Sequence, residues 1–162
     1  FTSMNKKVIL TKNQIANSIK RLSFEILERN IKHDNICLIG LDKNGYTIAQ
    51  RIHKVISENS TKKIETVQLN YSNKNFKLSK EINKKQKVVI LIDDVLKSGK
   101  TIIYAIKFLL DYDIEKLRTL VLIDRSHNNF PVGLDFTGLK LSTTLEEHIT
   151  VKLGQKEAAY LN

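Results

Sequence analysis

A short apolar run, Val88–Ile92, is followed at once by two acidic residues, and this pairing limits most strongly what the chain can fold into. The run predicts the most strongly apolar strand of the chain, and it is far too short to span a bilayer. A turn containing Ser98 and Gly99 then leads into a helix predicted from Thr101 to about Leu110. A strand, a polar turn and a helix in this order form part of a βαβ unit.

The same alternation continues along the rest of the chain. Thr11 can cap a helix that carries apolar residues on one face as far as Arg29, and a second helix carries apolar residues at 48, 52, 55 and 56. Further strands are predicted at 36–39, 64–69, 117–123 and 149–153, and residues 70–86 are predicted to form a long mobile loop or a hairpin. Together they predict an α/β fold with a mostly parallel twisted sheet, right-handed crossovers and flanking helices.

Three polar, turn-rich segments, 40–45, 93–101 and 124–133, follow predicted strand ends. Because ligands bind outside the carboxyl ends of the strands in such sheets, these segments are expected to converge on one site. A single domain over residues 4–162 is expected, since the length fits one domain and the sole proline, Pro131, leaves no linker. Residues 1–3, which precede Met4, are interpreted as a cloning remnant.

The net charge of +10 raises the possibility of a nucleic-acid partner. Only five of the 27 basic residues are arginines, so lysine spread over solvated faces explains most of the charge, and both interpretations stay open. No signal peptide and no membrane partner are indicated, which makes the cytoplasm the expected location. Cys37 is expected to fill the core, and the four histidines show no metal-ligand spacing.

The segment VVILIDDVLKSGKT, residues 88–101, contains the groups with the clearest chemistry. Its strand delivers two adjacent carboxylates to the edge of the sheet, and the following helix N-terminus, with hydroxyls at 98 and 101 and an amine at 100, suits a phosphate. A Walker A loop is excluded because Asp94 stands where a glycine would be required, and Tyr46 stands where the lysine would follow residues 40–45. A simpler alternative is that Asp93 and Asp94 only cap the helix.

Residues 88–101 resemble the 5-phosphoribosyl-1-pyrophosphate (PRPP) signature of type I phosphoribosyltransferases. Five segments, in the right order, are similar to the pyrimidine-operon attenuator/uracil phosphoribosyltransferase family. These segments are SFEILERN (23–30), LIGLDKNGYTIAQRI (38–52), LIDDVLKSGKTI (91–102), LVLIDRSHNNFPVGLDFTG (120–138) and EEHITVKL (146–153).

This resemblance implies a role for each part of the site. Asp93 and Asp94 would face the ribose hydroxyls and help to stabilise an oxocarbenium-like transition state. The 5-phosphate would lie in a cradle formed by Val95, Leu96, Lys97, Ser98, Gly99, Lys100 and Thr101. The pyrophosphate loop would consist of Leu41, Asp42, Lys43, Asn44 and Gly45, with a cis peptide before Asp42 or Lys43. Mg²⁺ would be bound mainly through PRPP itself, and residues 70–84 match the lid.

Departures from the family pattern bear on the choice of nucleobase. Lys97 stands where purine-specific relatives have a carboxylate base and uracil-type relatives commonly have tyrosine. In the pyrophosphate loop, Asn44 replaces an arginine of the family pattern. The lid lacks the Arg-Asp-Asp run of the family. Arg125 and Phe136 are candidates for contact with the base. The alternative for Arg125 is a salt bridge to Asp124 or Asp135, and the alternative for Phe136 is burial beneath the site.

Three functions remain open from the sequence. The first is transfer of phosphoribose to a nucleobase, with uracil favoured. The second is a nucleotide-sensing, RNA-binding regulator with weak or lost catalysis, and the third, less favoured because of Lys97, is a purine phosphoribosyltransferase. By analogy with the family, a homodimer or higher homo-oligomer is expected.

Overall fold

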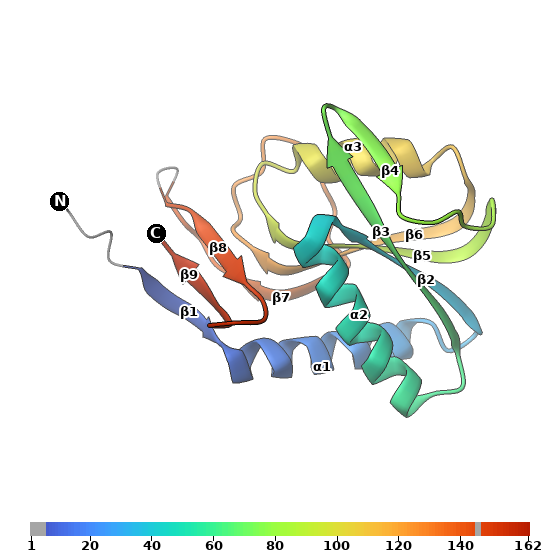
Figure 1. Ribbon diagram of the computed structural model, residues 1–162, viewed down its shortest axis with the longest axis horizontal. Helices are drawn as coiled ribbons and strands as arrows, with labels where there is room; N and C mark the ends of the chain where they lie inside the picture. The colour runs from blue at the N-terminus through green and yellow to red at the C-terminus, as the bar shows by residue number, and fades with distance from the viewer. Residues whose placement is uncertain (1–5, 145–146) are drawn as a thin grey trace.

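The computed structural model describes residues 6–144 and 147–162 (Figure 1). Its helices and strands follow one another as β1 (Lys7–Thr11), α1 (Lys12–Arg29), β2 (Asn35–Leu41), α2 (Asp42–Asn59), β3 (Lys63–Ser72), β4 (Asn75–Leu78), β5 (Lys85–Leu96), α3 (Lys100–Leu109), β6 (Asp113–Asp124), β7 (Phe136–Lys140), β8 (Ile149–Lys152) and β9 (Ala158–Leu161). None of the helices in the described part of the chain is long and apolar enough to cross a membrane.

The main sheet has six strands in the order β4-β3-β2-β5-β6-β7. All its neighbouring strands are parallel except β3 and β4, which pair antiparallel as a hairpin. The predicted α/β fold with a mostly parallel sheet is therefore confirmed. Strands β2 and β5 are neighbours, but the chain leaves β2 through α2 towards β3 and leaves β5 through α3 towards β6. The connections diverge there, and ligands bind at such a switch point, outside the carboxyl ends of the strands.

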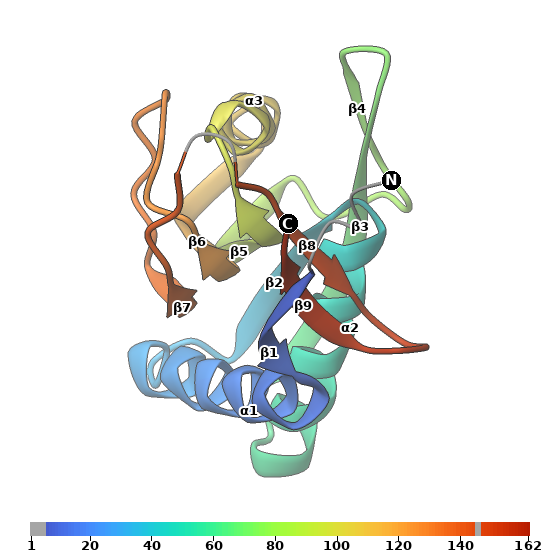
Figure 2. The same cartoon turned by 90° about the vertical axis from the view of Figure 1, so that its left-hand side faces the viewer.

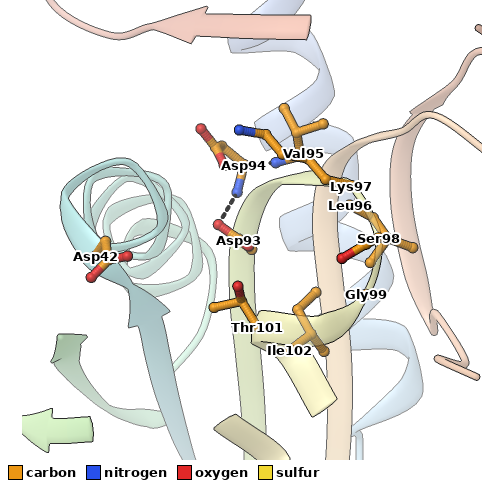
Figure 3. A pocket seen from close by; sticks show the side chains of 10 residues that line it. All are labelled: Asp42, Asp93, Asp94, Val95, Leu96, Lys97, Ser98, Gly99, Thr101 and Ile102. Carbon is orange, nitrogen blue, oxygen red and sulfur yellow. Dashed lines mark hydrogen bonds between the residues drawn. The ribbon is translucent and has the colours of Figure 1, made fainter. Parts of the chain in front are cut away.

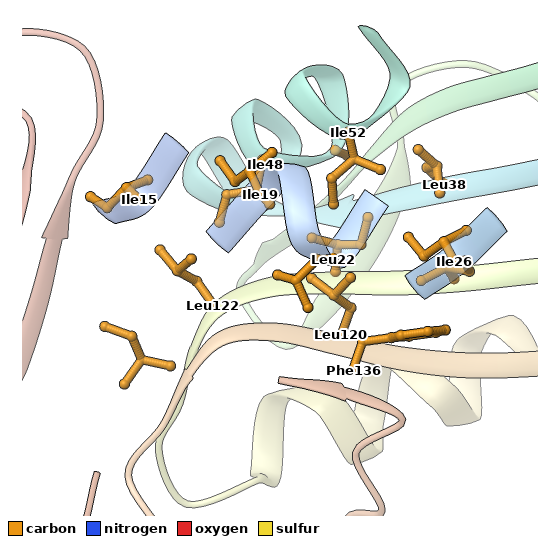
Figure 4. Packing of buried hydrophobic residues seen from close by; sticks show 14 of the residues in the cluster. Ile15, Ile19, Leu22, Ile26, Leu38, Ile48, Ile52, Leu120, Leu122 and Phe136 are labelled. Carbon is orange, nitrogen blue, oxygen red and sulfur yellow. The ribbon is translucent and has the colours of Figure 1, made fainter. Parts of the chain in front are cut away.

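Apolar side chains fill both faces of this sheet. One cluster packs α1 and α2 against one face, with Ile15, Ile26 and Ile52 each 0% exposed (Figure 4). The other cluster lies beneath α3, on the opposite face of the sheet from α1 and α2 (Figure 1). Helix α1 begins as the sequence predicts, since the Thr11 hydroxyl accepts the Gln14 backbone N–H at 3.3 Å, and the Gln14 side chain accepts the Thr11 N–H at 2.9 Å.

A smaller sheet of three antiparallel strands, in the order β1-β9-β8, lies beside the main one (Figure 1). Only β8 corresponds to a predicted strand. Leu10, Val151 and Ala159, one from each strand, belong to the same apolar cluster as α1 and α2, so the two sheets share a core. The expectation of a single domain over 4–162 stays a prediction.

Two of the boundaries that differ from those predicted concern the site. The chain from Asp42 to Gly45 is not a loop, because α2 begins directly after Leu41. Strand β5 does not end at Ile92 but continues through the two acids to Leu96, because β6 pairs with it as far as Asp124. Residues 70–86 contain part of the β3–β4 hairpin, which projects beyond the sheet (Figure 2).

Candidate functional site

A cavity of about 190 Å³ lies at the switch point, between the end of β5 and the start of α2 (Figure 3). Most of its wall comes from the predicted segment 93–101. The lining residues are Asp42, Asp93, Asp94, Val95, Leu96, Lys97, Ser98, Gly99, Thr101 and Ile102. Sequence reasoning missed only Ile102, which is buried beneath the turn and carries no polar group.

Two glycines allow α2 to begin directly against the strands. A Cβ atom on Gly40 would lie 2.4 Å from the backbone N of Tyr46, and one on Gly45 would lie 2.6 Å from the carbonyl oxygen of Ile92. Neither contact leaves room for a side chain. This close packing brings residues 42–44 next to the acids of β5. Asp42 has a φ of 52°, a left-handed conformation at the start of the helix, and no cis peptide bond occurs in residues 6–144 or 147–162, contrary to the expectation for this segment.

The two acids are held by short hydrogen bonds within the site. Asp93 Oδ1 accepts the backbone N–H of Asp94 at 2.8 Å, and Asp94 Oδ1 accepts that of Val95 at 2.7 Å. The other oxygen of Asp94, Oδ2, accepts a hydrogen bond from Asn44 Nδ2 at 2.9 Å. Helix α3 has Gly99 as its N-cap and no side-chain cap. The alternative in which the acids only cap the helix is therefore wrong.

Asp93 lies in an unfavourable place for a negative charge. Its burial raises its pKa well above that of an ordinary aspartate, and the neighbouring carboxylate of Asp94, with a smaller effect from Asp42, raises the pKa further. A carboxyl group with a raised pKa in the folded state stabilises the protein fully below its unfolded pKa. That contribution is lost as the pH rises through the folded pKa.

We therefore expect Asp93→Asn to raise the melting temperature of the ligand-free protein at pH 8 and to leave it almost unchanged near pH 3.5. At the lower pH the wild-type carboxyl is protonated in the folded state and mostly protonated in the unfolded state, so the substitution removes little charge. Thermal unfolding across this range, followed by circular dichroism, measures the effect. Asp111→Asn, at an exposed acid after α3, is the control and should show no such dependence. A gain independent of pH would contradict the account.

The turn between β5 and α3, called the cradle below, is the segment in which the sequence predicts a phosphate site. Gly99 adopts a φ of 87°, and a Cβ atom there would lie 3.0 Å from Val132 Cγ2. The carbonyl oxygen of Ser98 accepts the backbone N–H groups of Asn129 and Phe130 at 2.9 and 3.0 Å. The segment after β6 therefore holds the turn, although none of its residues lines the cavity. Ser98 and Thr101 line the cavity, and the Ser98 hydroxyl accepts the backbone N–H of Lys100 at 3.2 Å.

The two candidates for contact with a base lie in different surroundings. Arg125 is half-buried at the end of β6, and its Nε has no hydrogen-bond partner in the described part of the chain. The salt bridge with Asp124 or Asp135 is not formed, because Asp135 pairs instead with Arg118 at 3.2 Å. Phe136 is 2% exposed and packs in the core. No base can stack on Phe136 there, so this candidate is wrong.

The β3–β4 hairpin is hydrogen-bonded to Asp42 of the site, a contact that no sequence pattern predicts. Asp42 Oδ1 accepts the backbone N–H of Tyr71 at 3.0 Å. The rings of Tyr71 and Phe76 lie 4.7 Å apart, and Phe76 lies 5.9 Å from Phe108 of α3. The hairpin is thus attached both to the start of α2 and to the outside of α3.

Three other expectations concern groups away from the cavity. Burial, with a smaller effect of Glu65, raises the pKa of the Cys37 thiol to about 12, which fits a core residue rather than a nucleophile. In residues 6–144 and 147–162 no three His, Cys, Asp or Glu side chains gather closely enough to hold a metal ion. Glu146, in the last of the family-like segments, lies outside the described residues.

Known proteins resemble this chain in both sequence and structure. Residues 6–155 match the family described as phosphoribosyl transferase domain. The bifunctional protein PyrR of Fusobacterium nucleatum is 35% identical over 96% of this chain and 97% of its own, and that of Haemophilus ducreyi is 32% identical over 91% and 89%. Among solved structures, a hypoxanthine-guanine phosphoribosyltransferase of Bacillus anthracis has a TM-score of 0.79 at 17% identity, covering 98% of this chain and all of its own. The hypoxanthine phosphoribosyltransferase of Trypanosoma cruzi has a TM-score of 0.81 at 14% identity, covering 95% of each chain.

Proposed function

The chain belongs to the phosphoribosyl transferase domain family, as a type I member close to the PyrR proteins, and from that premise we propose that it transfers phosphoribose from PRPP to a nucleobase, with uracil preferred. The observation that supports this most directly is the pair of acids beside the cradle at the switch point. The cradle suits the phosphate of a ribose 5-phosphate group. The acids beside the cradle suit the ribose hydroxyls of the same molecule.

In the proposed reaction the bond between ribose C1 and the pyrophosphate oxygen breaks, and a bond from C1 to the base nitrogen forms. Pyrophosphate leaves with the electron pair, and the proton of that base nitrogen passes to the departing pyrophosphate or to solvent. Positive charge develops on the ribose ring in between. The carboxylates of Asp93 and Asp94 stabilise this charge and accept hydrogen bonds from the ribose hydroxyls, and Ser98, Thr101 and the N–H groups around them fix the phosphate.

Pyrophosphate is proposed to bind between the start of α2 and the two acids, at residues 41–45. Lys43 is exposed there and supplies positive charge, whereas Leu41 is buried and contributes only through its backbone. The carboxylates of Asp42, Asp93 and Asp94 line the cavity but do not gather closely enough to hold a metal ion themselves, so the oxygens of PRPP would supply most of the ligands of Mg²⁺. When bound, mainly through oxygens of PRPP, Mg²⁺ would neutralise the charge of the leaving group. Release of Asp42 from Tyr71 would free the hairpin to close over the substrate.

Lys97 is the residue of the cavity that bears most on the choice of base. It is exposed and lines the cavity wall. A protonated amine cannot accept a proton from a purine nitrogen, which counts against hypoxanthine and guanine. Arg125, whose Nε lacks a partner in the described part of the chain, is proposed to contact the oxygen atoms of the base.

We expect the purified protein with Mg²⁺ and PRPP to form UMP from uracil. Uracil, orotate, hypoxanthine, guanine and xanthine are to be supplied side by side at equal concentration, with release of pyrophosphate and the new nucleotide measured by chromatography. Uracil should give the highest rate, by about tenfold or more over each purine, because one misplaced or missing base contact changes specificity by that order. Turnover confined to a purine would contradict the choice of uracil. Bound PRPP without any turnover would favour the next candidate.

The second candidate function is a nucleotide-sensing regulator that binds RNA. The net charge of +10 favours it, because lysines and arginines that contact phosphates release counterions. This activity would suit a homodimer or higher homo-oligomer, in which basic residues of two chains form one surface. Filter binding of a structured RNA at several salt concentrations, with and without UMP, tests it. The proposal requires affinity that falls steeply with salt and changes with the nucleotide.

A further inference from the structure

The side chain of Asn44 connects three segments that are far apart in the sequence. Its Nδ2 atom donates one hydrogen bond to Asp94 Oδ2 at 2.9 Å and another to the carbonyl oxygen of Val151 at 2.9 Å. Asn44 is half-buried in the first turn of α2, Asp94 lies at the end of β5, and Val151 belongs to β8 in the smaller sheet. One amide group thus joins the start of α2, an acid of the site and the second sheet.

Both hydrogens of this amide are already used by acceptors of the protein. A side-chain amide has two N–H donors, and the two measured hydrogen bonds account for both. No side-chain N–H of Asn44 therefore remains for a pyrophosphate oxygen, although the residue lies in the segment proposed to bind that group. The Asn44 side chain must therefore act through the protein groups to which it is hydrogen-bonded.

The hydrogen bonds of Asp94 show that Asn44 helps to fix the orientation of the Asp94 carboxylate. Val95 N fixes one carboxylate oxygen of Asp94 from within its own strand, and Asn44 fixes the other from the neighbouring helix. With a partner on each oxygen, the plane of the carboxylate is set rather than free to rotate. Val151 is a stable anchor for this arrangement, because it is 6% exposed and pairs with Ala159 inside the smaller sheet.

On the premise of the proposed function, we propose that Asn44 is a positioning residue that holds the Asp94 carboxylate in the orientation required by the ribose hydroxyls of PRPP, with strand β8 as the fixed point. The smaller sheet then has a part in the reaction although none of its residues lines the cavity. A fixed carboxylate contributes because it needs no reorganisation when the sugar binds.

Calorimetric titration of Asn44 variants with two probes tests this inference. Magnesium PRPP reaches both the acids and the phosphate cradle, whereas inorganic phosphate carries no ribose hydroxyls for Asp94 to bind. Asn44→Ala removes the amide, Asn44→Asp keeps the shape without an N–H donor, and Asn44→Gln keeps the donor on a longer side chain. Asn59→Ala is the matched control, since Asn59 is exposed in the last turn of the same helix and its Nδ2 bonds only to the carbonyl oxygen of Val55, at 2.7 Å.

We expect Asn44→Ala and Asn44→Asp to bind magnesium PRPP about 10- to 100-fold more weakly, as the loss of one hydrogen bond to a charged group implies. Their affinity for inorganic phosphate should stay within about twofold of the wild type, because the cradle residues are unchanged. Asn44→Gln should recover part of the PRPP affinity. The Asn59→Ala variant should bind both probes like the wild type.

The following results would overturn the inference. If Asn44→Ala melts at a lower temperature but binds PRPP normally at 10 °C, the residue is only a structural bridge. An equal loss of affinity for both probes would show a general disturbance of the cavity rather than an effect on Asp94. A wild-type protein that does not bind PRPP would remove the proposed function itself, whereas normal binding by the wild type and by both donor-free variants would remove this inference alone.

Discussion

Replacing Asp94 by asparagine is expected to lower kcat/KM for phosphoribosyl transfer by about 100- to 1000-fold, with little change in melting temperature. The substitution keeps the size of the side chain and an oxygen that can accept the N–H of Val95, now 2.7 Å from Asp94 Oδ1. It also places an NH2 group opposite Asn44 Nδ2, so the melting temperature should fall slightly. It removes the negative charge beside the ribose ring, where positive charge develops. Losses of that size are typical when one group that stabilises transition-state charge is removed.

The rate of UMP formation and the melting temperature are to be measured on the same preparations. Asp113→Asn is the control, because Asp113 is exposed at the opposite end of β6, away from the cavity. The control should keep full activity. If Asp94→Asn lost stability and activity in parallel, the carboxylate would be a structural group and not a catalytic one.

The second large effect is expected from a single methyl group at Gly40. The added Cβ of Gly40→Ala would lie 2.4 Å from backbone atoms of Tyr46, so the start of α2 would have to move away from β2. We expect this to lower the free energy of unfolding by about 3 kcal/mol, as forced overpacking of backbone does. The displacement would also separate Asn44 from Asp94, so PRPP affinity should fall even where the variant is folded.

Urea unfolding of Gly40→Ala is to be compared with that of Gly133→Ala. A Cβ at Gly133 meets no atom within 4 Å, so this control should change the free energy of unfolding by less than about 0.5 kcal/mol. Similar stabilities for the two variants would show that the junction of β2 and α2 is looser than the structure indicates.

The cradle is the part of the site that the sequence predicts best. Its signals are local: an apolar strand, two acids, a glycine in a turn and a helix start are contiguous from 88 to 101, and local chemistry sets their geometry. The first helix was predictable for the same reason, since the capping box of Thr11 and Gln14 is contained within four residues.

The remaining features depend on contacts between distant residues. The start of α2 at Asp42 follows from packing of Gly40 and Gly45 against neighbouring backbone, which no local pattern records. Strand β5 continues through two acids because β6 extends beside it, with Asp93 opposite Val121. The short strands of the smaller sheet pair across almost the whole chain, for example Lys7 with Leu161. Pairing and packing with residues distant in the sequence decide the conformation of these segments more strongly than local propensity does.

The position of Phe136 shows a further limit. An aromatic residue near a polar segment is compatible both with stacking on a base and with burial, and the choice depends on which end of β7 it occupies. Phe136 is the first residue of β7 and lies opposite Leu120 of β6, below the edge where the cavity opens. The sequence did predict that the segments after β2, β5 and β6 meet, because this follows from the order of elements in a parallel sheet.

Calorimetric titration of the wild-type protein with magnesium PRPP tests the central claim most directly, namely that the acids of β5 and the cradle before α3 form one site for a phosphorylated, activated pentose. The account predicts saturable binding of one PRPP per chain, weakened by competing ribose 5-phosphate and weakened strongly by Asp94→Asn. Absence of binding, or binding that Asp94→Asn leaves unchanged, would contradict it.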